Sequence, residues 1–194
     1  MSQIKLKHSG GNSVIIAAPD SNPASDRTLK LPSDGDGTIL TTNSSVGKIL
    51  QVVSASTSDT ASFSGSGYVD GGVSVTMTPS AASSKIFVTY LFHMGHSLAN
   101  QRATRLARSV AGASYAGISG VETRAYQGNA YTTYQVHNIV LNYLDTPSYS
   151  LGQTVAYRVE VNPYSSTLWR NRYHDGTGGG NTMISTITAM EVAA

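Results

Sequence analysis

The feature that most constrains this chain is the alternation of apolar and polar residues in short runs from residue 48 to the C-terminal end. A period of two residues is typical of β-strands whose two faces meet different surroundings. The clearest run is Lys85–His93, which carries apolar residues on both faces, with Ile86, Val88, Tyr90 and Phe92 on one and Phe87, Thr89, Leu91 and His93 on the other. This pattern predicts a central strand, or one between the core and a neighbouring subunit.

Other runs predict further strands. Alternation is clear at residues 73–77, 153–162 and 182–192, and strands are also expected at 48–54, 131–144 and 167–173, with a weak strand near Phe63. Residues 101–111 fit a helix with Arg102, Arg105 and Arg108 on one face, or a strand, and the surroundings favour the strand. Seven or eight antiparallel strands in about 150 residues predict an all-β fold, an antiparallel β-sandwich resembling a jelly roll.

Residues 1–47 are predicted to form a separate arm or stalk before a sandwich of residues 48–194. The arm contains four very short strand patterns with few large apolar residues, namely Ile4, Leu6, Val14, Ile16, Leu29, Leu31, Ile39 and Leu40. One copy buries too little area to offset an ordering entropy of about 1–2 kcal/mol per residue. Three copies around a common axis bury more, which favours a trimeric stalk or a docked arm. A flexible arm that folds only on docking is the alternative.

The composition excludes several classes of protein. Charged residues make up 12% of the chain and the net charge is +2, without the clustered basic stripe that nucleic-acid binding needs. The absence of cysteine excludes disulfides and cysteine-based zinc sites. The first residues lack the apolar core of a signal peptide, and no apolar run approaches the roughly 20 residues of a membrane span. We expect synthesis in a cytoplasm and no membrane insertion.

Motifs for metal or catalytic chemistry are weak. His93 and His96 lie three residues apart, on opposite faces of a strand, so a strand-end turn is favoured over a metal pair. Residues 34–37 fit a tight turn better than a calcium loop, and residues 178–180 lack the lysine of a phosphate loop. Hydrolysis would need paired carboxylates, and the sequence places no two of its candidates together: Asp70, Glu122, Asp145, Glu160 and Asp175. We expect no enzyme activity, metal or cofactor.

The most suggestive cluster for binding contains the only tryptophan of the chain and comprises Trp169, Arg170, Arg172, Tyr173, His174 and Asp175. Flat aromatic faces and arginine forks suit sugars and acidic polysaccharides. Interface anchors and a strand with an aromatic face in the core use the same residues. A strand here would place Trp169 on one face and Arg170 with Arg172 on the other. Residues 115–134 are expected to form a loop whose Tyr- and Gly-rich composition suits a partner surface.

Two stretches resemble a known family. The first runs from Gly11-Asn12-Ser13-Val14 through Thr28-Leu29-Lys30-Leu31-Pro32 to Thr38-Ile39-Leu40-Thr41-Thr42, and the second includes Ser83-Ser84-Lys85-Ile86, Leu144-Asp145-Thr146-Pro147 and the C-terminal Ser185–Ala194. They are similar to segments of tail-fibre and other appendage proteins of tailed bacteriophages, especially marine ones. The resemblance implies a homotrimeric virion component without catalytic residues, which contacts other virion proteins. The chain is short for a fibre, so an adaptor, a knob or a capsid-surface fibre fits equally.

Two other functions stay open. A carbohydrate-binding β-sandwich module would use Trp169, Arg170, Arg172 and Tyr173 to recognise a host surface polysaccharide. A polysaccharide-degrading enzyme would need acid pairs across neighbouring strands, which the sequence gives no reason to expect.

Overall fold

The computed structural model describes residues 3–7, 9–11, 13–17, 48–96, 101–126, 136–173 and 183–194. The chain divides into two compact units, Met1–Thr42 and Asn43–Ala194. The expected boundary after residue 47 lies outside the described residues, as do the expected strands with Leu29, Leu31, Ile39 and Leu40.

The described part of the first unit is a two-stranded antiparallel sheet, β1 (Gln3–Lys7) and β2 (Ser13–Ala17). Its register places Ile4 opposite Ile16 and Leu6 opposite Val14, and the turn between the strands includes Gly11 at φ 98°. Both strands were expected from the sequence. The Leu6 side chain is 58% exposed, and an isolated two-stranded hairpin is marginally stable in water.

The second unit is all-β in its described residues, which confirms the expected fold class. Its strands are β3 (Ile49–Thr57), β4 (Ala61–Gly65), β5 (Val69–Met77), β6 (Lys85–His96), β7 (Gln101–Val110), β8 (Ala116–Tyr126), β9 (Val136–Asp145), β10 (Val155–Asn162), β11 (Ser166–Arg170) and β12 (Ser185–Val192).

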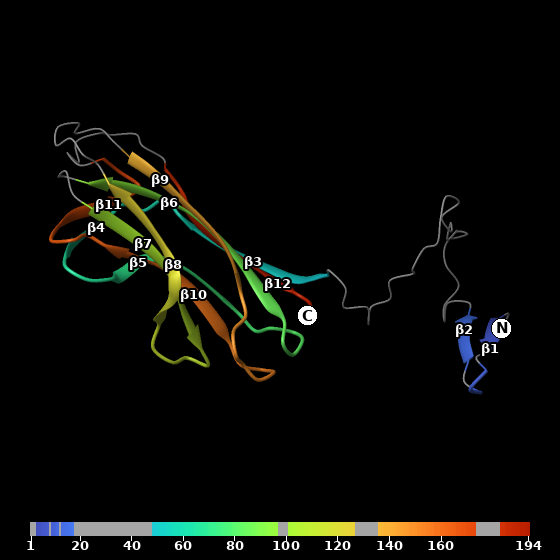
Figure 1. The fold of residues 1–194 in the computed structure, drawn as a ribbon. Helices are drawn as coiled ribbons and strands as arrows, with labels where there is room; N and C mark the ends of the chain where they lie inside the picture. The colour runs from blue at the N-terminus through green and yellow to red at the C-terminus, as the bar shows by residue number, and fades with distance from the viewer. Residues whose placement is uncertain are drawn as a thin grey trace. The chain divides into compact units, whose positions relative to one another are not determined.

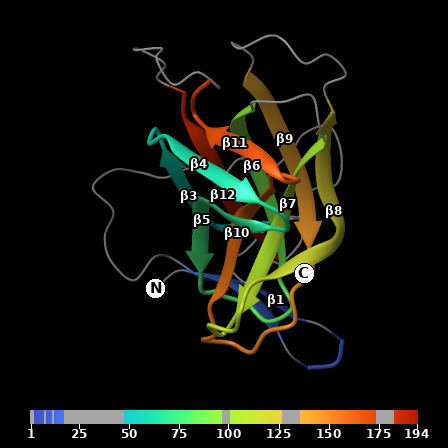
Figure 2. The same ribbon diagram turned by 90° about the vertical axis from the view of Figure 1, so that its left-hand side faces the viewer.

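These strands form two antiparallel sheets that face one another as a sandwich (Figure 1). One sheet has the order β5-β10-β7-β8, and the other contains β3-β12-β6 with β9 on the far side of β6. Among these eight strands, the first therefore pairs with the last and the second with the last but one, which is the strand order of a jelly roll. The remaining pair, β4 and β11, extends the larger sheet and lies side by side in Figure 2.

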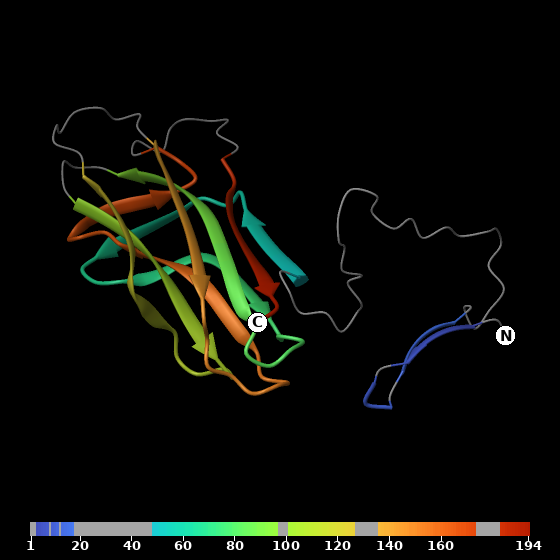
Figure 3. The same cartoon turned by 45° about the vertical axis from the view of Figure 1, so that its right-hand side comes forward.

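Strand β6 is the centre of the larger sheet. It pairs with β9 along one edge, and with β12 and then β11 along the other. Figure 3 shows β12 between β3 and β6. The sequence predicted a central strand here, and the six-stranded sheet confirms it.

The core lies between the two sheets and takes one face of each strand. From β6 it contains Ile86, Val88, Tyr90, Phe92 and Met94, all at most 1% exposed. The facing sheet contributes Val73, Val75 and Met77 from β5, Leu106 from β7, and Val155, Tyr157, Val159 and Val161 from β10. Burial of each large apolar side chain contributes about 1.5–3 kcal/mol, so this layer is the main source of stability.

The prediction that residues 115–134 form a loop is wrong for the part of this segment that the structure describes. Residues 116–126 form β8, paired with β7, and residues 127–134 lie outside the described residues. The two glycines of β8 obscure its alternation, and the register with β7 shifts between Arg105 and Ala107, next to Gly117. Residues 101–111 fit two patterns, and the structure confirms the strand.

Polar side chains connect the two sheets inside the sandwich. Arg108 of β7 forms an ion pair of 2.7 Å with the buried Asp145 at the end of β9. The Tyr157 hydroxyl of β10 donates to the same carboxylate at 2.7 Å. Burial and the neighbouring Asp145 raise the pKa of Tyr157, so the phenol stays neutral and serves as a hydrogen-bond donor.

Candidate functional site

The predicted binding cluster begins on β11, where Trp169 and Arg170 leave opposite faces of the strand. Arg170 is opposite Met94 and Trp169 is opposite Gly95 in the register with β6. Met94 lies in the core, so Arg170 belongs to the inner face of the sheet and Trp169 to the outer face. The Trp169 side chain is nevertheless only 9% exposed, because other residues cover it.

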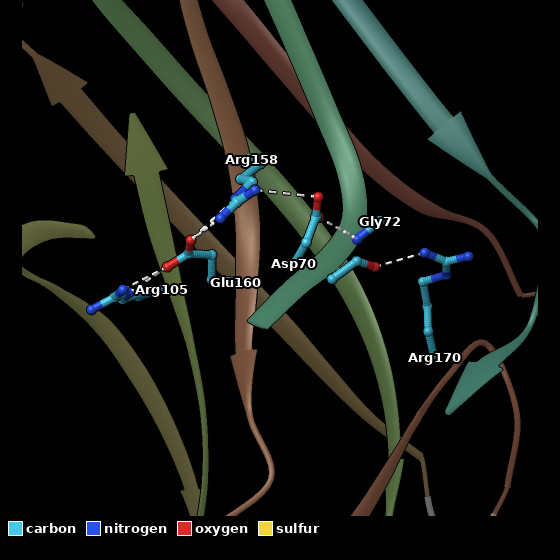
Figure 4. A network of polar contacts seen from close by, with 7 residues as sticks. Asp70, Gly72, Arg105, Arg158, Glu160 and Arg170 are labelled. Atoms are coloured by element: carbon cyan, nitrogen blue, oxygen red, sulfur yellow. Dashed lines mark hydrogen bonds and ion pairs between the residues drawn. The ribbon is translucent and has the colours of Figure 1, made fainter. Parts of the chain in front are cut away.

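Arg170 is engaged by the fold itself. Its Nη1 donates to the carbonyl of Gly71 at 2.6 Å, and its Nε donates to the carbonyl of Asp59 at 3.1 Å. Figure 4 shows the guanidinium reaching toward the start of β5 beside Gly72. Burial lowers the pKa of Arg170. A ligand would have to break these internal hydrogen bonds in order to use this guanidinium.

Asn171 ends β11 and redirects the chain. It has a left-handed backbone at φ 57°, and its buried amide Nδ2 donates to the carbonyls of Thr57 and Asp59. Its Oδ1 accepts a hydrogen bond from Ser185 Oγ at 2.7 Å. These contacts connect the end of β3, the end of β11 and the start of β12, so the turn has a structural role.

The turn corrects the expected distribution of the cluster. Strand alternation predicted Trp169 and Arg172 on opposite faces, but the left-handed Asn171 breaks the alternation. The Arg172 guanidinium instead lies 5.6 Å from the Trp169 ring centre, in a cation–π contact. Tyr173 is partly exposed beside it, and His174 and Asp175 lie outside the described residues. A glycan contact at this cluster stays a prediction.

A second polar group crosses the outer face of the four-stranded sheet. The register places Asp70 opposite Glu160, Glu160 opposite Arg105, and Arg105 opposite Glu122. One row of charged residues therefore spans β5, β10, β7 and β8. We call it the charged row, together with Arg158, which lies on the same face.

Glu160 is the centre of the charged row, as Figure 4 shows. One carboxylate oxygen pairs with Arg105 at 2.7 Å, and the other pairs with Arg158 at 2.6 Å. Arg158 also reaches the Asp70 carboxylate at 3.4 Å. The Glu160 side chain is only 3% exposed, so two guanidiniums compensate a buried negative charge.

Tyrosine rings cover both guanidiniums. The Tyr68 ring centre lies 3.9 Å from the guanidinium carbon of Arg105, and the Tyr115 ring centre lies 4.2 Å from that of Arg158. Burial raises the pKa of both tyrosines. At the end of the row, the Tyr68 hydroxyl and the Arg124 guanidinium lower the pKa of Glu122 against the opposing effect of burial. The row is thus a closed arrangement of paired charges.

Sequence reasoning missed the charged row. It did not bring Asp70, Glu122 and Glu160 together, because strand register decides which distant residues are opposite one another. Each of these carboxylates faces an arginine, whereas Asp145 is separately engaged inside the sandwich.

The structure also places the residues that suggested metal binding. His93 Nδ1 lies 2.7 Å from Asn138 Oδ1 of the neighbouring strand. Within the described ranges, no three His, Cys, Asp or Glu side chains are grouped so as to hold a metal ion. The same part of the chain contains no helix with the length and apolar content needed to cross a bilayer.

No protein-family model matches the chain, and no curated protein sequence matches it. Among solved structures, similarity extends to the infectious bursal disease virus Gt strain, at 16% identity and a TM-score of 0.36 over 95% of this chain and 48% of that one. The VP2 subviral particle of infectious bursal disease virus gives 16% identity and a TM-score of 0.33, over 94% of this chain and 47% of that one.

The chain thus spans about half the length of these viral chains. A superposition this partial assigns neither a family nor a function to this chain. The class of protein that the chain's own topology defines is an all-β jelly-roll protein with an additional unit whose described residues form a two-stranded sheet.

Proposed function

We propose that this chain is a non-enzymatic structural component of a bacteriophage virion, a short homotrimeric fibre or appendage that serves assembly and host-surface attachment. The observation that carries the proposal is the division of the chain into a jelly-roll body and a separate small unit. The described part of that unit is one hairpin of two five-residue strands. A hairpin of this size needs a partner surface for stability, and copies of the chain or other virion proteins supply one.

The jelly roll supports the same proposal at the level of fold. Double-sheet jelly rolls recur in viral capsid domains and in lectins. Fold alone does not determine function, so this support is an analogy. It agrees with the resemblance of the N-terminal and C-terminal segments to phage appendage proteins.

The chemistry of the charged row favours a structural role over hydrolysis. Glycosidases use one carboxylate as an acid and a second as a base or nucleophile, with space for substrate between them. Here Arg158 forms ion pairs with both Asp70 and Glu160. Arg105 lies between Glu160, with which it pairs, and Glu122, which it faces in the register. A carboxylate that is ion-paired with a guanidinium is a poor general acid, because the positive charge stabilises the ionised form of the carboxylate.

Light scattering on the intact chain tests the proposal. We expect a mass three times the 20.4 kDa of one chain, and a monomer at micromolar concentration would contradict a trimeric appendage. The variant that begins at Lys48 then locates the assembly. Retention of the trimer assigns association to the sandwich, whereas dissociation assigns it to residues 1–47.

A second candidate function is a carbohydrate-binding module, and the contact between Arg172 and Trp169 favours it. An arginine stacked on an aromatic ring beside a partly exposed tyrosine is suited to an acidic sugar. In this function Arg172 and Tyr173 contact the ligand, and the Trp169 ring holds the Arg172 guanidinium in place through the cation–π contact. Binding to an array of acidic polysaccharides tests it.

A further inference from the structure

The outer face of the six-stranded sheet differs in character from the charged row. Three cross-strand rows run over β3, β12, β6 and β9: Val52, Met190, Phe87 and Leu144 in the first, Ser54, Thr188, Thr89 and Asn142 in the second, and Ser56, Thr186, Leu91 and Val140 in the third. We call these residues the neutral face. The first row carries four large apolar side chains and the third carries two, while the row between them carries hydroxyls and an amide.

Large apolar side chains of the neutral face lie open to water in the single chain. Val52 and Val140 are each 54% exposed and Leu144 is 47% exposed. Phe87, Leu91 and Met190 are partly buried between them. Scattered apolar residues are ordinary on protein surfaces, but four in one cross-strand row, with two more on the same face, are typical of a surface that binds a partner.

From the neutral face we infer that copies of this chain associate through it, so that this surface of the sandwich forms the subunit interface. The inference rests on the proposed function and deepens it, because it names the surface by which the appendage assembles. The occupant of the face is a second copy of the same chain.

The absence of charge on the neutral face favours a second copy. None of its side chains carries a formal charge, so two copies meet without like-charge repulsion and without desolvating an ionised group. The polar groups of the middle row already pair in part within the sheet, since Ser54 Oγ and Thr188 Oγ1 lie 2.9 Å apart. The charged row on the opposite sheet would instead have to desolvate several ionised groups.

The size and composition of the neutral face fit the centre of an interface. Its twelve residues lie three to a strand on four strands, and at about 4.8 Å between strands and about 3.3 Å per residue they cover roughly 300 Å² in plan. This is the size of an interface centre, since a specific interface buries about 800 Å² on each partner and includes flanking side chains. Depletion of charge at the centre of the patch is the compositional mark of such interfaces.

A matched pair of full-length variants tests the inference. Val52→Lys combined with Leu144→Lys introduces two lysines at the ends of the first apolar row. Both side chains are exposed, so we expect the fold to tolerate the change. The control combines Leu151→Lys with Ser66→Lys and adds the same charge outside the face. Leu151 is 62% exposed between β9 and β10, and Ser66 is exposed between β4 and β5. Circular dichroism verifies that both variants are folded.

Light scattering across a dilution series gives the result. We expect the neutral-face variant to dissociate, with a dissociation constant raised about 100-fold or more, while the control keeps the mass of the unmodified chain. An unmodified trimer whose neutral-face variant remains trimeric would overturn the interface and leave the proposed function standing. A dimer that the variant dissociates would support the interface and contradict the trimer. A monomeric unmodified chain would overturn both.

Discussion

The guanidinium of Arg170 fills the space into which a side chain at residue 72 would project, and Gly72 is the residue that leaves this space open. Gly72 has φ +73°, a left-handed conformation that L side chains rarely adopt. Arg170 uses the space to donate a hydrogen bond to the neighbouring carbonyl of Gly71. The start of β5 and the end of β11 are thereby joined.

This relationship predicts that Gly72→Ala destabilises the sandwich in two ways. The methyl group strains the backbone and also displaces the buried Arg170 guanidinium, with a combined cost of about 2–4 kcal/mol. Gly67→Ala is the matched control, because Gly67 has a similar φ of +95° and open space around it. Urea unfolding should show the larger loss for Gly72→Ala. Equal losses would mean that Arg170 moves aside without cost.

Removal of the central negative charge of the charged row should also destabilise the fold. Glu160→Gln leaves Arg105 and Arg158 facing one another across a neutral amide, at a cost of about 1–3 kcal/mol after allowance for their partial exposure. Arg124→Gln, at the exposed end of the row, should change the free energy of unfolding little. A Glu160→Gln protein as stable as the unmodified chain would show that the row contributes no net stability.

The surroundings of Glu191 predict that the free energy of unfolding depends on pH. Burial by itself would raise the pKa of this carboxyl, but hydrogen bonds from Ser80, Gln51 and Ala81 outweigh that effect and lower the pKa. A depressed pKa stabilises the folded state above the carboxyl's ordinary pKa, and the contribution is lost as the pH falls through the folded value. The free energy of unfolding should therefore decrease as the pH falls below 4.5, the ordinary pKa of this carboxyl. Glu191→Gln should remove part of this dependence, and an unchanged pH profile would contradict the assignment.

Substitutions in the predicted binding cluster around Trp169 should separate effects on the stability of the fold from effects on glycan binding. Trp169→Ala should cost about 3–5 kcal/mol of unfolding free energy, because the ring is almost fully buried. Arg172→Gln should leave the fold intact, and it should abolish polysaccharide binding if the cluster contacts a glycan. Arg124→Gln is the control for a general loss of positive charge. Binding that survives Arg172→Gln would place any glycan site elsewhere.

The strands that sequence reasoning located best are those with an uninterrupted period. In β5 the expected inner residues Val73, Val75 and Met77 are buried, and the alternating Ser74 and Thr76 are exposed. In β6 the expected inner face is the core. These strands follow from pattern alone, because burial on one face and exposure on the other leaves a local signal.

Other features depend on contacts between distant residues and leave no local signal. Arg170 and Asn171 had the residue types of a binding surface, yet both are buried in internal hydrogen bonds. Glu191 has a residue type that is usually exposed, yet it is fully buried on the inner face of β12. The groups that pair with these side chains are mostly backbone carbonyls and amides, and they come from β3 and the residues after it, from β5 and the turn after it, and from the start of β12. Only the arrangement of the sheets brings them together.

The position of β12 between β3 and β6 has a consequence for biosynthesis. The described residues of β3 pair with β12 alone, and Gln51 bonds to Glu191 across 140 residues of sequence. The ribosome therefore releases β3 long before its hydrogen-bonding neighbour exists. Until β12 arrives, β3 is an unpaired edge that invites aggregation. We expect the larger sheet to close after translation, slowly, as non-local β topologies do, with chaperone protection during the delay.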